Sequence, residues 1–218
     1  MRKYFMTLCV LLATLPTWAQ APYACVTKGA VLEYANYNEE DKVESYSRQV
    51  LQEVSDLGNG NYDFRITNST IAEPGQKDEG ADAFVTLGEI REGAARIAIS
   101  GMNGTVDVSG SDPALLQLPN KLAVGYQLPI GDIRVSMEGI AVVASVTDNE
   151  VIGREEVTVP AGKFKCYIVK QDVEVNMMGV AAVTTTKTWY SRGVGIVKSE
   201  STMGNRLVAR TELVTFKK

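Results

Sequence analysis

The stretch VTVPAGKFKCYIVKQDVEV, residues 157–175, decides the fold class of this chain. Two runs rich in β-branched and aromatic residues flank the short turn at Pro160, Ala161 and Gly162, a pattern typical of strands. A connection this short joins antiparallel neighbours, because parallel strands need a much longer crossover. The stretch therefore predicts a hairpin in an antiparallel sheet.

The same pattern recurs along most of the chain. Residues 29–38 and 42–54 are further strand candidates, and DLGNGN at 56–61 is a hairpin signal because glycine and asparagine accept positive φ at low cost. In the run that follows, Tyr62, Phe64 and Ile66 alternate with polar residues, as expected for a half-buried strand. From residue 132 onward nearly every segment is a strand candidate. We expect an all-β, mainly antiparallel fold: one curved sheet, or a half-open barrel.

One short helix is predicted in SDPALLQLP, residues 111–119. Asp112 can cap it and Pro113 suits its first position. Leu115, Leu116 and Leu118 supply an apolar face. Pro119 disfavours helix for the residue before it, so the helix should be short.

The first 19 residues are predicted to be a cleavable signal peptide. Arg2 and Lys3 precede an apolar run that is too short to span a bilayer, and Ala19 provides a small residue for cleavage before Gln20. A retained membrane anchor is the alternative. Residues 20–218 suit a single β-rich domain, periplasmic or secreted, with no transmembrane segment in the mature chain.

Loss of the leader changes the formal net charge. The whole chain has 22 basic and 26 acidic residues, a net charge of −4, and removal of Arg2 and Lys3 makes it −6. Such a surface repels phosphate backbones, and no run of basic residues offsets it. We therefore expect no nucleic-acid partner.

Two cysteines remain after cleavage, Cys25 and Cys166. An even pair in an oxidising compartment predicts a disulfide, which would fasten the N-terminal segment to a core strand. Two free structural thiols and a lipidated Cys25 are the alternatives. A catalytic thiol is disfavoured, because the chain contains no histidine to serve as its base.

Three stretches together resemble a known family: LPNKLAVGYQLP (118–129), VTVPAGKFKCYIV (157–169) and WYSRGVGIVKSE (189–200). In this order they are similar to exported TapB-like proteins related to the family called domain of unknown function 3108. The resemblance implies the fold of the lipoprotein carriers LolA and LolB, in which a curved antiparallel sheet half-wraps a short helical plug. It also implies pairing of Cys25 with Cys166. The family has no established reaction, so the resemblance assigns no catalytic residue.

Enzymatic chemistry is not expected. The absence of histidine removes triads, most metal sites and the commonest general base. Glu155 and Glu156 could in principle share acid–base work, but neighbours on a strand point to opposite faces. No nucleotide-binding or phosphate-cradling motif is present, so we expect no cofactor and no metal.

An apolar set of side chains suggests a binding function instead. The residues that could line an apolar groove on the concave face are Tyr34, Tyr46, Phe64, Met137, Trp189 and Tyr190. The alternative is that they fill the core. The sequence thus predicts a non-enzymatic exported protein that binds or carries an apolar ligand such as a lipid or acyl chain. A structural or protein-interaction module of the cell envelope is the second hypothesis.

Overall fold

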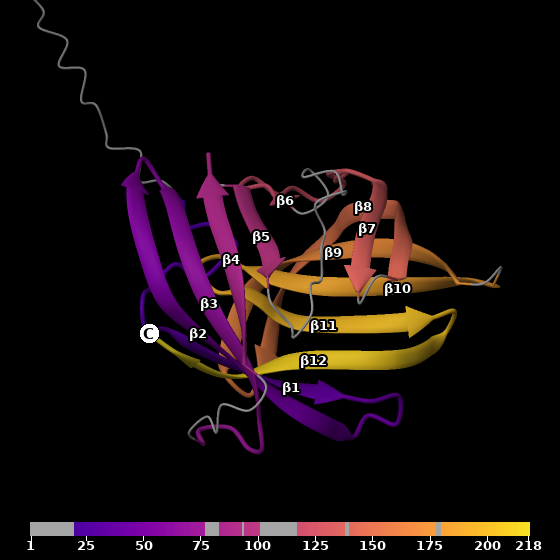
Figure 1. Cartoon of the computed structure of the whole chain (residues 1–218), viewed down its shortest axis with the longest axis horizontal. Coiled ribbons are helices and arrows are strands. Elements are labelled where there is room, and N and C mark those ends of the chain that lie inside the picture. The colour runs from indigo at the N-terminus through magenta and orange to yellow at the C-terminus, as the bar shows by residue number, and fades with distance from the viewer. Residues whose placement is uncertain (1–19, 77–82, 93, 101–116, 138–139, 178–179) are drawn as a thin grey trace, which may run out of the picture.

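A computed structural model describes residues 20–76, 83–92, 94–100, 117–137, 140–177 and 180–218. Within these residues the regular structure is entirely β (Figure 1). The first six strands are β1 (Val31–Tyr37), β2 (Val43–Gly58), β3 (Asn61–Ile71), β4 (Phe84–Arg91), β5 (Ala94–Ser100) and β6 (Gln117–Leu118). The others are β7 (Gly131–Met137), β8 (Ile140–Val159), β9 (Gly162–Met177), β10 (Val180–Ser191), β11 (Gly195–Met203) and β12 (Arg206–Lys217).

All twelve strands belong to one antiparallel sheet in the order β6-β5-β4-β3-β2-β1-β12-β11-β10-β9-β8-β7. Strands adjacent in sequence are adjacent in the sheet except β6 and β7, which form its two edges. At the centre of the sheet the first strand pairs with the last: Val31 lies opposite Lys217 and Tyr37 opposite Arg210. The sheet is strongly bent, and in Figure 1 strands β2 to β4 run across the direction of β10 to β12. The predicted antiparallel curved sheet is confirmed.

The predicted turns are present at both hairpins discussed above. Gly58, Asn59 and Gly60 all have positive φ, with Asn59 at 55°, which is the conformation that Asn-Gly turns favour. Val159 pairs with Gly162 at the β8–β9 turn. The quoted stretch at 157–175 therefore forms a hairpin between two of the longest strands of the sheet.

The main core lies within the bend of the sheet. It contains buried side chains from both halves of the sheet, which we call its two arms: β1 to β5 and β8 to β12. These side chains are Leu32 and Tyr34 of β1, Leu51 of β2, Phe64 and Ile66 of β3, Ile90 of β4, Ala95 of β5, Val159, Cys166, Trp189, Val197 and Leu213. Ala24, Cys25 and Ala30, from the segment before β1, are part of the same cluster. The extended N-terminal segment thus fills part of the space that we expected a helix to fill.

The predicted helical plug is not found in the described residues. Most of the segment predicted to form it, residues 111–116, lies outside the residues that the structure describes. Its last part, Gln117 and Leu118, is extended and pairs as β6 with Arg96 and Ala95 of β5. Pairing with an available sheet edge satisfies the backbone there, and Pro119 disfavours helix at Leu118.

A second, smaller core covers the opposite face of β9. Tyr23, Leu122, Leu128, Val151 and Val169 are buried in it, and Leu118, Tyr167 and Tyr190 pack against it. Because successive strand residues point to opposite faces, Cys166 and Ile168 face the main core while Tyr167 and Val169 face this one. This part of the sheet is therefore covered on both faces.

Candidate functional site

Three of the six residues predicted to line an apolar groove lie in the main core instead. Tyr34, Phe64 and Trp189 are 6%, 4% and 6% exposed and belong to the main core. The Tyr34 hydroxyl donates to the carbonyl oxygen of Ile196 at 3.1 Å, so the ring is buried and its polar group is hydrogen-bonded within the protein. The Phe64 ring lies over Gly88, its partner on β4. These three side chains fill the core.

The other three predicted groove residues are placed differently. Tyr46 is half-buried on β2, opposite Ala35. Tyr190 is half-buried on the second core, opposite Tyr167. Met137 ends β7, where its backbone lies opposite Ile140. The six residues therefore do not gather on one surface.

Trp189 also organises the polar groups around it. Its indole Nε1 donates to Glu155 Oε1 at 2.5 Å, and the Lys198 ammonium lies 5.0 Å from the ring centroid. Glu155 lies opposite Cys166 on β9, whereas Glu156 lies opposite Lys165. The two neighbouring carboxylates thus have different partners and do not form an acid–base pair.

The predicted disulfide is not present. Cys25 and Cys166 are both free and buried. They belong to the same core cluster, but the Cys166 Sγ faces the carbonyl oxygen of Phe164 at 3.6 Å. Cys25 lies beside Tyr34. The pKa of the Tyr34 phenol is raised mainly by burial and to a smaller extent by Cys25. The export argument predicted a disulfide between these two residues, whereas each thiol is free and packs as a small core side chain.

Buried free thiols should be unreactive in the native protein. Burial, with a smaller effect of the Glu155 charge, raises the pKa of Cys166 to about 12, so almost no thiolate exists at neutral pH. We expect a thiol-specific reagent to label neither cysteine in native protein and both after unfolding in denaturant without reductant. Mass spectrometry of the labelled protein measures this, and an unfolded protein with no reactive thiol would contradict the free-thiol assignment.

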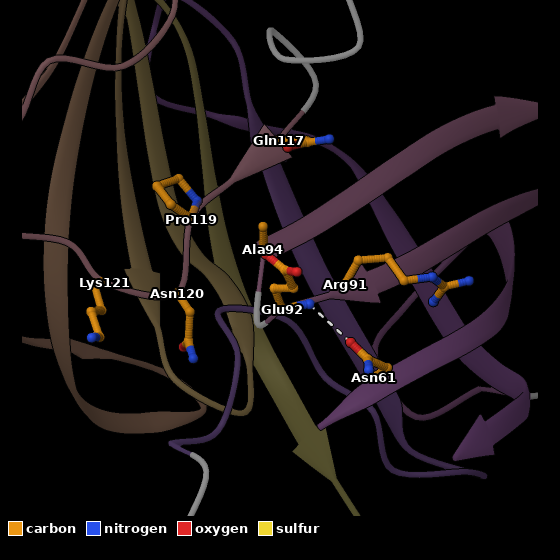
Figure 2. Close-up of a pocket in the computed structure, with 8 residues that line it drawn as sticks. All are labelled: Asn61, Arg91, Glu92, Ala94, Gln117, Pro119, Asn120 and Lys121. Carbon is orange, nitrogen blue, oxygen red and sulfur yellow. Dashed lines mark hydrogen bonds between the residues drawn. The ribbon is translucent and has the colours of Figure 1, made fainter. Parts of the chain in front are cut away.

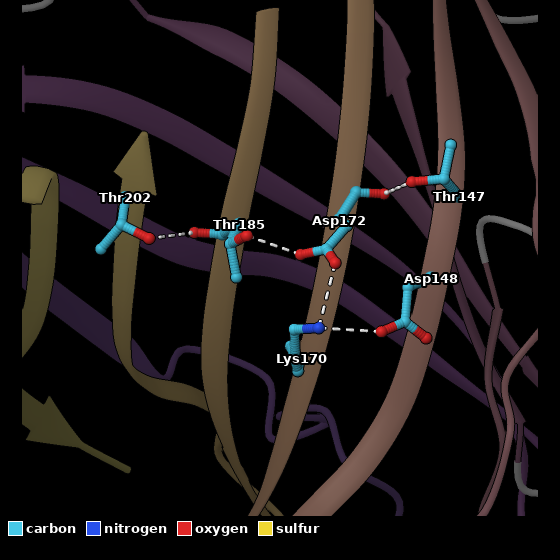
Figure 3. Close-up of polar contacts among 6 residues, drawn as sticks. All are labelled: Thr147, Asp148, Lys170, Asp172, Thr185 and Thr202. Carbon is cyan, nitrogen blue, oxygen red and sulfur yellow. Dashed lines mark hydrogen bonds and ion pairs between the residues drawn. The ribbon is translucent and has the colours of Figure 1, made fainter. Parts of the chain in front are cut away.

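A polar network crosses β8, β9, β10 and β11 (Figure 3). Lys170 Nζ lies 2.9 Å from Asp148 Oδ2 and 3.0 Å from Asp172 Oδ2, and Thr185 Oγ1 donates to Asp172 Oδ1 at 2.6 Å. The hydrogen bonds to Asp148 and Asp172 raise the pKa of Lys170. Lys170 is therefore held as an ammonium ion, which suits a structural ladder between strands and not a general base.

A cleft of about 720 Å³ opens beside β3, β4 and β6 (Figure 2). It is lined by Asn61, Arg91, Glu92, Ala94, Gln117, Pro119, Asn120 and Lys121. The charge of Arg91 is neutralised, because its Nη2 lies 2.5 Å from Asp63 and 3.2 Å from Glu89. Six of its eight lining residues are polar or charged, and none of the residues predicted to line an apolar groove is among them.

A more distinctive surface is formed by residues 119–130, which we call the crossover segment. It runs from β6 at one edge of the sheet to β7 at the other and is bonded to β8 on the way. Gly125 N donates to Val151 O at 2.8 Å, Val151 N to Tyr126 O at 3.0 Å, and Leu128 N to Asn149 O at 2.7 Å. The buried side chains of Leu122 and Leu128 anchor it in the second core.

The crossover segment presents large apolar side chains to solvent. Val124, Tyr126 and Ile130 are 61%, 44% and 60% exposed. Tyr126 N donates to Ala123 O at 3.0 Å, and Gly125, with a φ of +85°, takes the turn position that requires positive φ. Val124 therefore projects from the tip of a well-defined turn.

Arg192, in the turn between β10 and β11, fastens the crossover segment to the N-terminal segment. Its Nη1 donates to Ala21 O and to Asn120 Oδ1, both at 2.7 Å, and its Nη2 donates to Asn120 O at 2.5 Å. Gly193, with a φ of 68°, donates its N–H to Pro22 O at 2.7 Å. One turn thus joins segments that are far apart in the sequence.

The same arginine begins a stack of cationic and aromatic groups. The Arg192 guanidinium carbon lies 4.3 Å from the Tyr23 ring centroid. Tyr23 packs edge-to-face on Tyr167, with centroids 6.1 Å apart, and the Arg154 guanidinium carbon lies 5.6 Å from the Tyr167 centroid. We call these four residues the Arg–Tyr stack.

The sequence did not identify the Arg–Tyr stack as a site. Its one available signal was the resemblance, because Asn120, Tyr167 and Arg192 each fall in a different one of the three motifs. Tyr23 and Arg154 lie outside those motifs. Their role depends on contacts between distant segments, which local patterns do not encode.

Two further site classes find no support in the described part of the chain. It contains no group of three or more acidic or cysteine side chains suited to a metal ion. It also contains no helix with the length and apolar character needed to cross a membrane.

Comparisons with known proteins give a family and a fold. A DUF3108-like family model matches residues 91–213, more than half of the chain. No curated protein matches. A candidate exported protein with a YmcC-like fold from Bacteroides fragilis has a TM-score of 0.68 and 18% identity, over 91% of this chain and 100% of its own. A candidate lipoprotein from Parabacteroides distasonis has a TM-score of 0.69 and 17% identity, over 91% and 99%. At these identities the likeness shows the fold alone.

Proposed function

The chain belongs to the DUF3108-like family, and from this premise we propose that it is a non-enzymatic exported protein that binds lipid through the crossover segment. The matched residues include the whole of that segment. Export is supported by the basic and apolar leader at 1–19 and agrees with the descriptions of the two structural neighbours.

One observation carries the proposal: three large apolar side chains are exposed on one short segment whose backbone is hydrogen-bonded to β8. Val124, Tyr126 and Ile130 lie within seven residues, whereas Leu122 and Leu128 between and beside them are buried. Fully burying a valine or isoleucine side chain contributes about 1.5–3 kcal/mol. The tyrosine adds an apolar ring with a polar tip, which suits a lipid–water boundary.

The rigidity of the segment favours binding. Its backbone is bonded to Val151 and Asn149, and Arg192 holds its start through Asn120. Little conformational freedom remains to be lost when the exposed side chains become buried, so more of the burial free energy appears as affinity.

Replacing both aliphatic side chains tests the proposal. We expect the Val124→Ser/Ile130→Ser variant to bind phosphatidylcholine vesicles about tenfold or more weakly than the wild type, measured by co-sedimentation over a range of lipid concentrations. The exposed positions make unfolding of the variant unexpected, which circular dichroism checks.

Leu57→Ser is the matched control. Leu57 is 54% exposed but lies at the β2–β3 turn, so its replacement should leave vesicle binding unchanged. Wild-type protein that does not sediment with vesicles, or equal loss in both variants, would refute the proposed function.

Carriage of an acyl chain inside the concave face remains a prediction. Its weakness is that Tyr34, Phe64 and Trp189 already fill that space. Kinship with TapB-like proteins and with the LolA and LolB carriers also remains a prediction. Recovery of a lipid-sized mass with native protein in mass spectrometry would support carriage over surface binding.

The second candidate function is a protein-interaction module of the cell envelope. It is favoured by the edge strand β7, which has β8 on one side and, in the described sheet, no strand on the other. An exposed edge can accept a strand from a partner. Binding of a partner protein by the wild type, with no sedimentation on vesicles, would favour this function.

A further inference from the structure

Among the arginines whose side chains the structure describes, two have no acidic partner. Side chains are described for seven arginines. Five of these form ion pairs: Arg48, Arg65, Arg91, Arg206 and Arg210. Among the described residues, Arg154 and Arg192 form none, and these are the two arginines of the Arg–Tyr stack. Both guanidinium groups contact the same pair of aromatic rings.

The two guanidinium groups flank a single pair of rings. Arg192 lies against Tyr23 and Arg154 against Tyr167, and the two rings contact each other edge-to-face. Burial raises the pKa of Tyr23, while the charges of Arg192 and Arg154 act to lower it. Both cations therefore lie within electrostatic range of the same hydroxyl.

Unused hydrogen-bonding groups remain at the stack. The Tyr23 side chain is 4% exposed. Its hydroxyl has no hydrogen-bond partner of standard geometry among the described residues, but the Arg192 guanidinium lies close enough to act as a weak donor to it and so to lower its pKa. An arginine has five N–H donors. Arg192 uses three, for Ala21 O, Asn120 Oδ1 and Asn120 O, and a fourth is directed at the Tyr23 hydroxyl, which leaves one. Arg154 is exposed and, within the described chain, its contact is the Tyr167 ring.

We propose that the Arg–Tyr stack binds a phosphate group, held by the free N–H donors of Arg154 and Arg192 beside the Tyr23 hydroxyl. Guanidinium groups bind phosphate through paired, charge-assisted hydrogen bonds. Stacking on tyrosine rings holds each guanidinium group in place before the ligand arrives.

The residues around the stack include one carboxylate, one lysine and part of the crossover segment. The next residue of β8 on the same face as Arg154 is Glu156, and it lies directly opposite Lys165. Leu122 and Leu128 of the crossover segment pack in the same core as Tyr23 and Tyr167. The phosphate site therefore adjoins the segment that exposes apolar side chains.

A phosphate site next to exposed apolar side chains fits a phospholipid. A phospholipid offers an apolar part to the crossover segment and a phosphate to the stack. The inference rests on the proposed function only for lipid as the source of the phosphate, since a free phosphate compound presents the same group to the arginines.

Arg154→Gln tests the site without disturbing the fold, because Arg192 has structural hydrogen bonds and Arg154 has none among the described residues. We expect wild-type protein to bind phosphatidylcholine vesicles containing phosphatidic acid about tenfold more tightly than vesicles without it. Arg154→Gln should lose this enhancement and keep the binding to pure phosphatidylcholine. If the source is a free compound, inorganic phosphate should raise the melting temperature of the wild type and not of Arg154→Gln.

Arg206→Gln is the matched control, since it removes the same charge from an exposed position and should behave as wild type. An Arg154→Gln variant that keeps both the phosphatidic acid enhancement and the response to inorganic phosphate would overturn the site. So would a wild type that shows neither. The proposed function fails separately: Val124→Ser/Ile130→Ser would then bind pure phosphatidylcholine normally, whatever Arg154→Gln does.

Discussion

Replacing Arg48 with methionine should lower the free energy of unfolding by about 3–5 kcal/mol. The carboxylate of Glu33 is 1% exposed and accepts hydrogen bonds from Arg48 Nε and Nη2 at 2.9 and 2.6 Å. Gly75 N also donates to it, at 3.0 Å. Without the guanidinium group, the carboxylate remains buried near the centre of the sheet without a countercharge. Denaturant unfolding followed by Trp189 fluorescence measures the loss.

Arg65→Met is the control for this prediction. The Arg65–Glu53 pair is 4.0 Å apart, and its side chains are 48% and 69% exposed, so the loss should stay below about 1 kcal/mol. Equal losses in the two variants would show that burial of Glu33 does not decide the effect.

The pH dependence of Arg48→Met follows from Glu33. Burial raises the pKa of Glu33, but hydrogen bonds from Thr215, Arg48 and Gly75 outweigh it, so the pKa is below its ordinary value. The ionised carboxylate thus stabilises the wild type above the unfolded pKa of about 4.3, and this contribution is lost as pH falls through the folded pKa. A protonated Glu33 needs no cation. The difference between Arg48→Met and wild type should therefore be smaller at about pH 4 than at neutral pH.

Replacing Trp189 with alanine should cost about 3–5 kcal/mol. The side chain is 6% exposed and belongs to the main core. Its removal leaves a cavity, the Glu155 carboxylate without its indole donor, and Lys198 without its aromatic contact. Unfolding followed by circular dichroism measures the change.

Trp189→Phe separates packing from hydrogen bonding. It keeps most of the buried ring and loses the Nε1 donor, so its cost should be nearer 1–3 kcal/mol, about the value of a hydrogen bond to a charged group. If Trp189 lines a ligand groove, Trp189→Ala should instead retain near wild-type stability and lose ligand. That result would refute the core assignment.

Local patterns predicted much of the fold. The alternation at Tyr62, Phe64 and Ile66, the Asn59–Gly60 turn and the Pro160–Gly162 turn each act over a few residues, and β2, β3, β8 and β9 have the expected hairpin relation. Most of the helix expected after Asp112 lies outside the described residues, and at its end Gln117 and Leu118 are extended because they pair with the sheet edge at β5. Helix propensity and capping residues carry no information about whether a sheet edge is available for pairing.

The candidate site was less predictable. The aromatic residues were identified as a group, but whether Phe64 or Trp189 faces a core or a groove depends on how the two arms of the sheet bend together. The disulfide was predicted from an oxidising compartment and an even number of cysteines, and neither shows the direction in which a thiol points. The Arg–Tyr stack joins Tyr23 to Tyr167 and Arg192, residues separated by most of the chain.

Antiparallel strands joined by tight turns could be predicted from the amino-acid sequence, because side-chain alternation and turn residues act through neighbouring peptide units. Three features required the folded structure: the pairing of β1 with β12, the exposure of Val124 and Ile130 on the crossover segment, and the lack of acidic partners for Arg154 and Arg192 in the described residues. These features depend on the order and curvature of the whole sheet, which bring together groups that no local pattern links.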